Sequence, residues 1–420
     1  MRRSTVTIGK SKGVPRIWLE GKWLLSSGFS YGSLIHVDIR ESCITVVSSY
    51  DGERRVSGKR HGTIPVIDLN STEVGTAFKD AHTVMVTSGD HTITITPSHT
   101  ELMRVTREMV YREASVFSGG GILTLAASLC GFTPVMAVEV ESLYASIYER
   151  GHPTASMYQM SISDVPFEEF SKYKPIGLFT AGIPCEPFSL SRRGGSSSLG
   201  SSLVPEAHEL GDMVFWCLRA ITSLNPHTVV LEEVPSFLSS GAYQILLHVL
   251  LRLYRHVEAR VLDPVDYGCL TGRRRAVIVA QDVPICWPVE SKSERLLGDI
   301  FDDTGDHSWF DRSSKGWLFD HWDKQTARGN GFASTVYDAS SPYIGTIKRR
   351  YFAQQGDAPV IAHPTLPSTY RWLTLSEVRR LHGVPETYYL GDSKTVAGEV
   401  LGQGVVVDMF RAVIASVVSC

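Results

Sequence analysis

The sequence predicts an α/β protein with a parallel sheet, preceded by a β-rich domain. From residue 114 onward, short apolar runs typical of buried strands alternate with segments of helical periodicity, which is the pattern of a parallel sheet covered by helices. Before about residue 105, polar and apolar residues alternate over short runs, as they do in half-buried strands. A glycine-rich turn directly follows the first apolar run of the second region.

Residues 1–105 are expected to form the β-rich N-terminal domain. The segment "SLIHVDIRESCITVVSS" alternates loosely, and "VMVTSGDHTITITP" is typical of two strands joined by a Ser-Gly-Asp turn. Residues 101–113 are more charged, and we interpret them as a connector. We detect no internal repeat along the chain from the sequence alone.

Residues 114–285 supply the predicted sheet and its helices. The helical segments "ELGDMVFWCLRAITSL" and "AYQILLHVLLRLY" carry the apolar stripe of amphipathic helices. The expected strands are "SVFS" (115–118), "VMAVEV" (135–140), "IGLFTAGI" (176–183), "HTVVLEEV" (227–234) and "RRAVIVA" (274–280).

Residues 286–365 lose this alternation and are rich in Asp, Gly, Ser and Trp, which predicts a small irregular insert. Regular patterns return in residues 366–420. There "TLSE" (374–377) is a capping box that opens a helix, and "VVVDMFRAVIASVV" is an apolar final helix. We therefore expect the chain to leave the sheet domain, form the insert, and return.

Composition excludes several classes of protein. The chain has 420 residues with 43% hydrophobic and 20% charged residues, which is typical of a globular protein, and we expect no membrane span or secretory signal. A net charge of −3 argues against a basic nucleic-acid coat, so any DNA contact must use local patches. Seven scattered cysteines without CxxC or HExxH patterns favour a reducing cytoplasm and no metal site.

The glycine turn "SVFSGGGILTLAASLCGF" suggests a cofactor site. Glu139 follows Gly119 by 20 residues, at the end of the next expected strand. A carboxylate there can accept hydrogen bonds from ribose hydroxyls. Thr124 stands where GxGxxG needs its third glycine, so a cofactor with ribose but no pyrophosphate fits better, such as S-adenosylmethionine. Ordinary turn structure is the alternative.

Chemically capable side chains lie near three further strand ends. Cys185 follows "IGLFTAGI", Glu232 lies in "VVLEEV", and Arg273 and Arg275 lie in "GRRRAVIV". Each has a plain structural alternative, since cysteine is often a small buried hydrophobe and charged residues often face solvent. Because open α/β sheets deliver functional groups at strand ends, their combination with the glycine turn predicts an active site.

Residues from about 114 to 420 resemble the DNA (cytosine-5) methyltransferase family. Seven motifs occur in the family's order: "SVFSGGG", "AVEVESLYASIYERGHP", "AGIPCEPFS", "LEEVPSFL", "YGCLTGRRRAVIVA", "RWLTLSEVRRLHGVPETY" and "LGQGVVVDMFRAV". The resemblance implies a Rossmann-like class I methyltransferase fold that uses S-adenosylmethionine. It also implies that residues 286–365 form a small target recognition domain, and that 330–350 could meet a DNA groove.

The resemblance also implies the roles of individual residues. Cys185 would add to C6 of a cytosine, and Glu232 would protonate or hydrogen-bond ring N3, with burial raising its pKa. Arg275 would bind the base O2 and Glu232, and Arg273 would orient the pocket. The base must be flipped out of the duplex, and the loop after Cys185, with Arg192 and Arg193, would close over it.

The cofactor residues implied by the resemblance surround the glycine turn. They are Phe117, Ser118, Gly119, Gly121, Glu139, Val140, Ser161, Ile162, Pro184, Gln403 and Val405. The sequence departs from the family pattern mainly at supporting positions. Ser115, Glu186, Glu233, Thr271 and Gln403 stand where the family has Asp, Gln, Asn, Gln and Asn. A modified methyl donor or an already modified cytosine is therefore an alternative.

The N-terminal stretch "RIWLEGKWLLSSGFSYGSLIHVDIRESCITVV" resembles swapped-hairpin regulators of the AbrB and SymE type. That resemblance implies self-association and an accessory contact to DNA. The alternative is a β-domain that merely covers the catalytic core.

The sequence as a whole predicts a DNA cytosine-5 methyltransferase that acts on double-stranded DNA. Its setting would be a restriction-modification system in the cytoplasm of a bacterium or a phage-infected host cell. Two alternatives stay open. One is a relative that modifies RNA or transfers a group other than methyl, and the other is a catalytically silent DNA-binding regulator.

Overall fold

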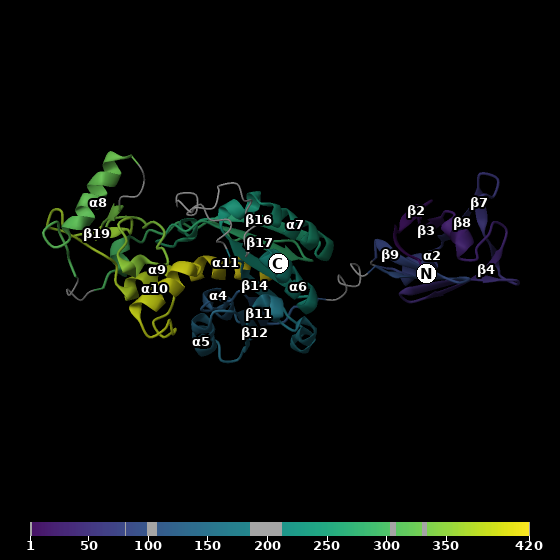
Figure 1. Ribbon diagram of the computed structural model, residues 1–420, viewed down its shortest axis with the longest axis horizontal. Helices are drawn as coiled ribbons and strands as arrows, with labels where there is room; N and C mark the ends of the chain where they lie inside the picture. The colour runs from purple at the N-terminus through teal and green to yellow at the C-terminus, as the bar shows by residue number, and fades with distance from the viewer. Residues whose placement is uncertain are drawn as a thin grey trace. The chain divides into compact units, whose positions relative to one another are not determined.

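The computed structural model describes residues 2–79, 81–98, 107–184, 212–302, 308–329 and 334–419. The chain divides into two compact units, Met1–Thr106 and Arg107–Cys420 (Figure 1). The division falls next to residue 105, where the sequence places the end of the β-rich domain. The insert and the returning C-terminal segment belong to the same unit as the α/β sheet.

The described part of the N-terminal unit consists of antiparallel strands and two short helices, α1 (Trp23–Ser26) and α2 (Thr72–Ala77). One sheet has the order β1-β9-β10-β5-β4-β6 and a second has the order β2-β3-β8-β7. The hairpin predicted for "VMVTSGDHTITITP" is confirmed as β9–β10, and the loosely alternating "SLIHVDIRESCITVVSS" forms a second hairpin, β4–β5. The strands are β1 (Arg2–Thr7), β2 (Gly9–Ser11), β3 (Val14–Glu20), β4 (Leu34–Arg40), β5 (Cys43–Ser49), β6 (Arg54–Arg55), β7 (Ser57–Lys59), β8 (Ile64–Asn70), β9 (Thr83–Gly89) and β10 (Thr92–Pro97).

The second unit contains the predicted α/β sheet, with the order β13-β12-β11-β14-β15-β17-β16. The five expected strands are present within three residues of their predicted bounds. The sequence patterns missed β13, which is short, and β16, whose charged residues hide its alternation. The strands are β11 (Arg112–Val116), β12 (Thr133–Glu139), β13 (Ser156–Gln159), β14 (Leu178–Gly182), β15 (Thr228–Glu233), β16 (His256–Leu262) and β17 (Arg275–Gln281).

Strand β17 departs from the predicted parallel pattern, because it runs antiparallel to both of its neighbours. Strands β13, β12, β11, β14 and β15 pair in parallel. The reversal of β17 places its first residues beside the last residues of β15, with Ala276 opposite Glu233 and Val277 opposite Glu232. A side chain that starts one strand can therefore meet a side chain that ends the other.

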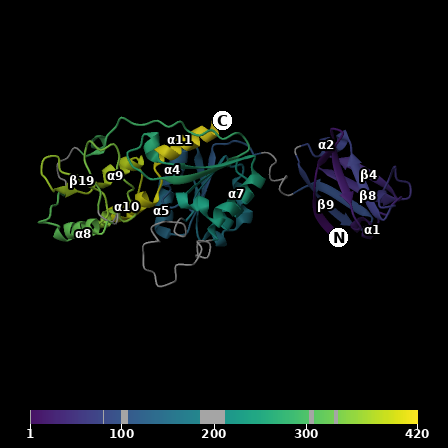
Figure 2. The same ribbon diagram turned by 90° about the horizontal axis from the view of Figure 1, so that it is seen from above.

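Helices cover the sheet and support its strand ends. Helix α11 packs against α4 beside the sheet (Figure 2). The predicted apolar face of α6 is largely confirmed, since Val214, Cys217, Ile221 and Leu224 are buried. The helices are α4 (Ile122–Ser128), α5 (Ser142–Gly151), α6 (Met213–Leu224), α7 (Gly241–Leu253), α8 (Gly316–Ala327), α9 (Leu375–His382), α10 (Lys394–Gln403) and α11 (Val407–Val418).

The insert is more regular than its composition predicts. It contains α8 and the strands β18 (Val336–Tyr337) and β19 (Val360–Ala362), which form a small sheet with β20 (Tyr370–Arg371) of the returning segment. Phe310, Leu318, Phe319 and Val360 form a separate small core there. Aromatic and polar residues mask the helical period of α8, which explains why the sequence pattern did not reveal it.

The capping box predicted at 374–377 is confirmed and is part of a buried ion pair. The Thr374 side chain accepts the Glu377 N–H, and Glu377 accepts the Thr374 N–H. Arg371 donates to both Glu377 oxygens at 2.7 and 2.9 Å, and both side chains are buried. The pair joins β20 to the start of α9.

One described stretch, Lys394–Val418, has the length and apolar composition of a membrane-crossing helix. It is divided into α10 and α11, and most of it is buried inside the unit. Among the described cysteines, Cys43, Cys130, Cys217 and Cys269 are free thiols, whereas Cys286 is disulfide-bonded.

Candidate active site

The glycine turn lies between β11 and α4, and its backbone conformation explains its composition. Gly119 and Gly121 have φ of 52° and 80°, in the left-handed region that favours glycine. A Cβ added to Gly119 would meet no atom within 4 Å. The turn therefore borders open space at Gly119, as a ligand-binding loop at a helix N-terminus requires.

Glu139, the last residue of β12, is held against this turn. Its two carboxylate oxygens accept the N–H groups of Gly119 at 2.8 Å and Glu141 at 2.9 Å. Burial raises the pKa of Glu139, and these backbone donors oppose that rise. A carboxylate has about four acceptor positions, so Glu139 retains capacity for further donors beside Gly119.

The C-terminal segment supports the turn from behind. A Cβ on Gly121 would lie 2.6 Å from the Tyr388 hydroxyl, and one on Gly120 would lie 2.7 Å from Val400 Cγ1. The Tyr388 hydroxyl donates to the Gly120 carbonyl at 2.8 Å. A Cβ on Gly404 would lie 3.0 Å from Ile122, so residues 403–405 pack beside the start of α4. This packing brings Gln403 and buried Val405 close to the glycine turn.

The remaining predicted cofactor residues differ in their surroundings. The structure leaves Val140 exposed by 59% and buries Ile162. Ser161 caps a short 3₁₀ helix, η1 (Ile162–Asp164), and its hydroxyl lies 2.8 Å from that of Ser163. Phe117 has a φ of 52°, and the N–H of Ser118 donates to the Val138 carbonyl at 3.1 Å.

Glu232 and Arg275 form an ion pair at the adjoining strand ends. Arg275 Nε lies 2.5 Å from Glu232 Oε1, and the two side chains are 14% and 13% exposed. The reversal of β17 makes this contact possible. The carboxylate and the guanidinium are therefore fixed together in a mostly dehydrated position, where their charges act strongly on a nearby group.

Gly182 connects this pair to the glycine turn. A Cβ there would lie 3.3 Å from Glu232 Oε2 and 4.0 Å from the Phe117 carbonyl oxygen. The end of β14, the Glu232 carboxylate and the glycine turn thus meet around one point. Pro184, half-buried, follows β14 by two residues, and Cys185 is the next residue in the chain.

The predicted nucleophile Cys185 lies outside the described residues, as do Glu186, Arg192 and Arg193. The structure therefore brings Glu232 and Arg275 together and leaves the position of the thiol open. Cys185 nevertheless follows Gly182 by only three residues, and Gly182 is paired with Glu232 across β14 and β15.

The buried Arg273 side chain connects the start of β17 to the insert and to the end of α10 by hydrogen bonds. Its guanidinium donates to the carbonyls of Gly402 at 2.9 Å, Gln403 at 3.2 Å and Ile347 at 3.4 Å. It thus satisfies carbonyls at the C-terminus of α10, where a cation is also favoured by the helix dipole. These contacts hold the insert and α10 next to the start of β17.

Glu233 and His382 are buried titratable groups whose environment the sequence did not reveal. Glu233 is fully buried, Val234 N–H donates to its Oε2 at 2.5 Å, and its Oε1 has no hydrogen-bond partner among the described residues. Burial raises its pKa to about 9, so it is neutral near pH 7. Burial and nearby Arg273 lower the pKa of His382 to about 4, so its imidazole is also neutral.

Glu233→Gln is expected to remove a pH dependence of stability. The unfolded carboxyl ionises near pH 4.5 and the folded one near 9, so the folded state binds one more proton between these values. The free energy of unfolding of the wild type should fall by about 1.4 kcal/mol per pH unit over this range because of Glu233. The glutamine variant should lack this contribution.

Denaturant unfolding at pH 6 and pH 8 measures the effect. The free energy of unfolding of the wild type minus that of Glu233→Gln should fall by about 3 kcal/mol from pH 6 to pH 8. The exposed variant Glu168→Gln serves as the control and should follow the wild type. Parallel pH profiles for wild type and Glu233→Gln would show that the carboxyl does not stay neutral.

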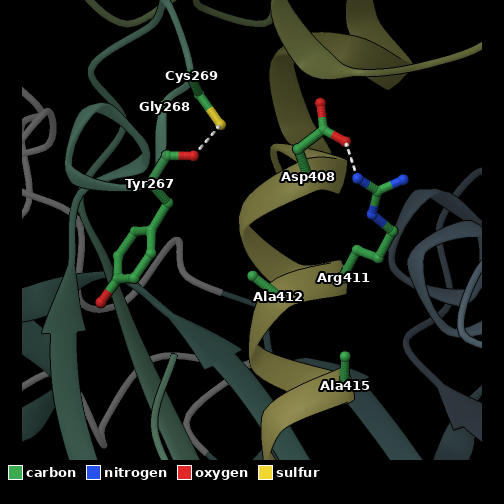
Figure 3. A pocket seen from close by; sticks show the side chains of 7 residues that line it. All are labelled: Tyr267, Gly268, Cys269, Asp408, Arg411, Ala412 and Ala415. Atoms are coloured by element: carbon green, nitrogen blue, oxygen red, sulfur yellow. Dashed lines mark hydrogen bonds and ion pairs between the residues drawn. The ribbon is translucent and has the colours of Figure 1, made fainter. Parts of the chain in front are cut away.

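A separate shallow pocket lies along the flank of α11 (Figure 3). It has a volume of about 380 Å³ and is lined by Tyr267, Gly268, Cys269, Asp408, Arg411, Ala412 and Ala415. Burial raises the pKa of Cys269 to about 12, so its thiol is not ionised near pH 7. The lining includes none of the predicted site residues, and the pocket is distinct from the Glu232–Arg275 pair.

Comparison with known proteins relates this geometry to a family. Residues 111–419 match the model of the C-5 cytosine-specific DNA methylase family. The chain is 24% identical over 315 residues to the type II methyltransferase M.DsaV of Dactylococcopsis salina, covering 71% of this chain and 83% of that protein. It is 25% identical to M.NlaX of Neisseria lactamica, covering 66% of this chain and 86% of the relative.

Solved structures agree on the fold. The crystal structure of S. pombe Dnmt2 methyltransferase superposes with a TM-score of 0.57 at 18% identity, covering 73% of this chain and 98% of that one. The Entamoeba histolytica methyltransferase EhMeth gives a TM-score of 0.60 at 14% identity, over 74% and 98% of the two chains. The second unit therefore has the Rossmann-like fold of S-adenosylmethionine-dependent methyltransferases, and the chain belongs to the C-5 cytosine-specific DNA methylase family, which methylates cytosine in DNA.

Proposed function

We propose that this chain methylates C5 of a flipped cytosine in double-stranded DNA through a covalent bond to Cys185, with Glu232 and Arg275 activating the base. The family supplies the reaction and the methyl donor, S-adenosylmethionine. The observation that carries the assignment of residues is the ion pair of Glu232 and Arg275 beside Gly182, three residues before Cys185.

The residues of the glycine turn fit S-adenosylmethionine. Gly119 borders open space, and the Glu139 carboxylate beside it retains acceptors for ribose hydroxyls. The cofactor would supply an electrophilic methyl group. We propose Phe117, Ser118, Gly119, Gly121, Glu139, Val140, Ser161, Ile162, Pro184, Gln403 and Val405 as its binding residues.

Glu139→Ala is expected to weaken S-adenosylmethionine binding by about 10- to 100-fold, because hydrogen bonds to a charged acceptor are lost. Calorimetric titration of the purified protein measures the dissociation constant. Glu141→Ala, an exposed carboxylate two residues away, is the matched control and should bind normally. A wild-type dissociation constant for Glu139→Ala would refute the ribose role.

The side chains of Cys185, Glu232 and Arg275 would activate the cytosine ring for methyl transfer. Addition of the Cys185 thiolate to C6 breaks the C5–C6 double bond and makes C5 nucleophilic. Glu232 hydrogen-bonds or protonates N3, which receives electron density during addition. Arg275 holds Glu232 and faces the same strand end, where it can also bind the base O2. C5 would then receive the methyl group of the bound cofactor, which would be left as S-adenosylhomocysteine. Loss of the C5 proton then lets the Cys185 thiolate leave C6 and restores the C5–C6 double bond.

A direct test is mass spectrometry of the nucleosides from digested genomic DNA of cells that express the protein and otherwise lack cytosine methylation. An increase in 5-methylcytosine is the expected result. A nucleoside of another mass would indicate an altered donor, and modification confined to RNA would indicate an RNA-directed relative. DNA binding without any new nucleoside would indicate a catalytically silent regulator.

The target recognition role of residues 286–365 is part of the proposal. Two of the basic side chains near its end are already paired, Lys348 with Asp357 and Arg349 with Glu399, whereas Arg350 is exposed. The relatives named as type II methyltransferases support a restriction-modification setting. The cytoplasm of a bacterium or of a phage-infected cell is the location that we propose with it.

We also propose an accessory DNA contact for the N-terminal unit. Residues 1–106 contain 13 Lys and Arg against 10 Asp and Glu, a net charge of +3, while the whole chain has −3. Positive charge favours contact with phosphates, and the effect should weaken with added salt. Charge-neutralising Lys10→Gln with Lys12→Gln should therefore weaken DNA binding at low salt and leave single-turnover methylation at saturating DNA unchanged.

A further inference from the structure

The N-terminal unit carries one sequence pattern twice. The segment "GKSKGVPRIWLEGKWLLSSGFSYGSLIHVDIRESCITVV" (9–47) aligns with "GKRHGTIPVIDLNSTEVGTAFKDAHTVMVTSGDHTITIT" (58–96). The expectation of no internal repeat is therefore wrong, because the identities are sparse and become clear only when the strands are aligned. Identical pairs include Lys10 and Lys59, Pro15 and Pro65, Ile17 and Ile67, Leu19 and Leu69, Phe29 and Phe78, Val37 and Val86, and Ile44 and Ile93.

The order of the strands repeats in the same way. Strands β1 to β5 with α1 form the first half, and β6 to β10 with α2 form the second half. Strand β1 is then equivalent to β6, β2 to β7, β3 to β8, β4 to β9 and β5 to β10. Exchanging each strand for its equivalent turns the orders β1-β9-β10-β5-β4-β6 and β2-β3-β8-β7 into the same orders written in reverse. The two halves are therefore related by an approximate two-fold axis.

The central pairings are self-complementary, as a two-fold axis requires. Where β3 meets β8, Ile17 is opposite Leu69, and the equivalent Ile67 is opposite Leu19. The contact of β5 with β10 has the same property. There Ile44 is opposite Ile95, and Val46 is opposite Ile93.

Each half also gives its first strand to the other half. Strand β1 pairs with β9, and β6 pairs with β4. Equivalent backbone hydrogen bonds cross between the halves in both directions. They are Ser42 N–H to Ala77 O at 3.0 Å, His91 N–H to Ser27 O at 3.1 Å, Ile8 N–H to His82 O at 2.9 Å, and Val56 N–H to Ser33 O at 2.9 Å.

The hydrophobic core is shared equally between the halves. Equivalent side chains from both repeats are buried in a single cluster, including Ile17 with Ile67, Leu19 with Leu69, Phe29 with Phe78, and Ile44 with Ile93. A lone half would expose its side of this cluster, and a segment of its size rarely buries enough surface to fold alone.

We infer that the N-terminal unit is a dimer built within one chain: a tandem duplication whose halves exchange strands and bury one common core. The second repeat occupies the interface that a separate copy would otherwise fill. The inference does not depend on the proposed reaction.

Light scattering of the purified chain and of a variant that lacks residues 2–50 tests this inference. The intact chain should not dimerise through its N-terminal unit, so its mass should be that of one chain. The deletion variant keeps the second repeat alone, and this repeat should pair with the same repeat of another chain. Its mass should therefore double, and it should return to one chain when residues 2–106 are removed altogether.

Two results would overturn the inference. One is an intact chain that dimerises and becomes monomeric when residues 2–106 are removed. The other is a deletion variant that stays monomeric with its remaining repeat folded, as shown by amide hydrogen exchange. If the variant aggregates, co-expression of residues 1–50 as a separate peptide should restore a soluble one-to-one complex, and failure of that rescue also contradicts the inference.

Discussion

Replacement of Cys185 by alanine is expected to abolish cytosine methylation, with a loss of more than about 10⁴-fold, because the other groups cannot form the covalent bond to C6. S-adenosylmethionine affinity should stay close to that of the wild type, since the glycine turn and Glu139 are unchanged. The measurement combines transfer of a labelled methyl group to DNA with calorimetric titration of the cofactor.

The control for this variant is Cys217→Ala, which removes a free thiol buried in α6. It should reduce stability more than it reduces the rate per folded molecule. A stable covalent complex with DNA containing 5-fluorocytosine should form with the wild type and with Cys217→Ala. Its formation by Cys185→Ala, or methylation by that variant at the wild-type rate, would disprove the role of Cys185.

Glu232→Gln is expected to lower the methylation rate by about 10²- to 10⁴-fold, the range that a positioned acid-base group contributes. Glutamine keeps the size of the side chain but cannot protonate N3, and it removes the negative partner of Arg275. Single-turnover rates with saturating DNA and cofactor isolate this effect from binding.

Two comparisons separate a chemical role of Glu232 from a structural one. Glu149→Gln, on the exposed face of α5, should leave the rate unchanged. The Glu232→Gln protein should keep its cofactor affinity and should still bind DNA. A rate within about threefold of the wild type would contradict the role of Glu232, since a general acid contributes at least about 100-fold.

The sequence predicted the elements whose patterns are local. The glycine turn, the buried strands and the "TLSE" cap each follow from neighbouring residues, and the structure contains all of them. The motifs also predicted that Glu232 and Arg275 would meet. Sequence patterns alone could not reveal the antiparallel direction of β17, because strand direction depends on the connection through β16 and not on side-chain alternation.

Other features depend on contacts between distant residues. Glu233 follows Glu232 directly, yet the structure buries its carboxyl completely, and this burial raises its pKa to about 9. Arg273 was expected to orient the pocket, and its carbonyl partners at positions 347, 402 and 403 were not readable from a linear motif. Burial and long-range hydrogen bonding determine such roles, and neither has a local signal.

Covalent fusion of the two N-terminal repeats has an evolutionary consequence. In an assembly of identical chains every substitution appears twice, whereas each fused repeat can mutate independently while the shared core is retained. The divergence is already visible in the equivalent hairpins, where Lys12-Gly13 forms one turn and Arg60-His61-Gly62 forms part of the other. The unit can thereby present two dissimilar faces, so a ligand that it contacts need not itself be symmetric.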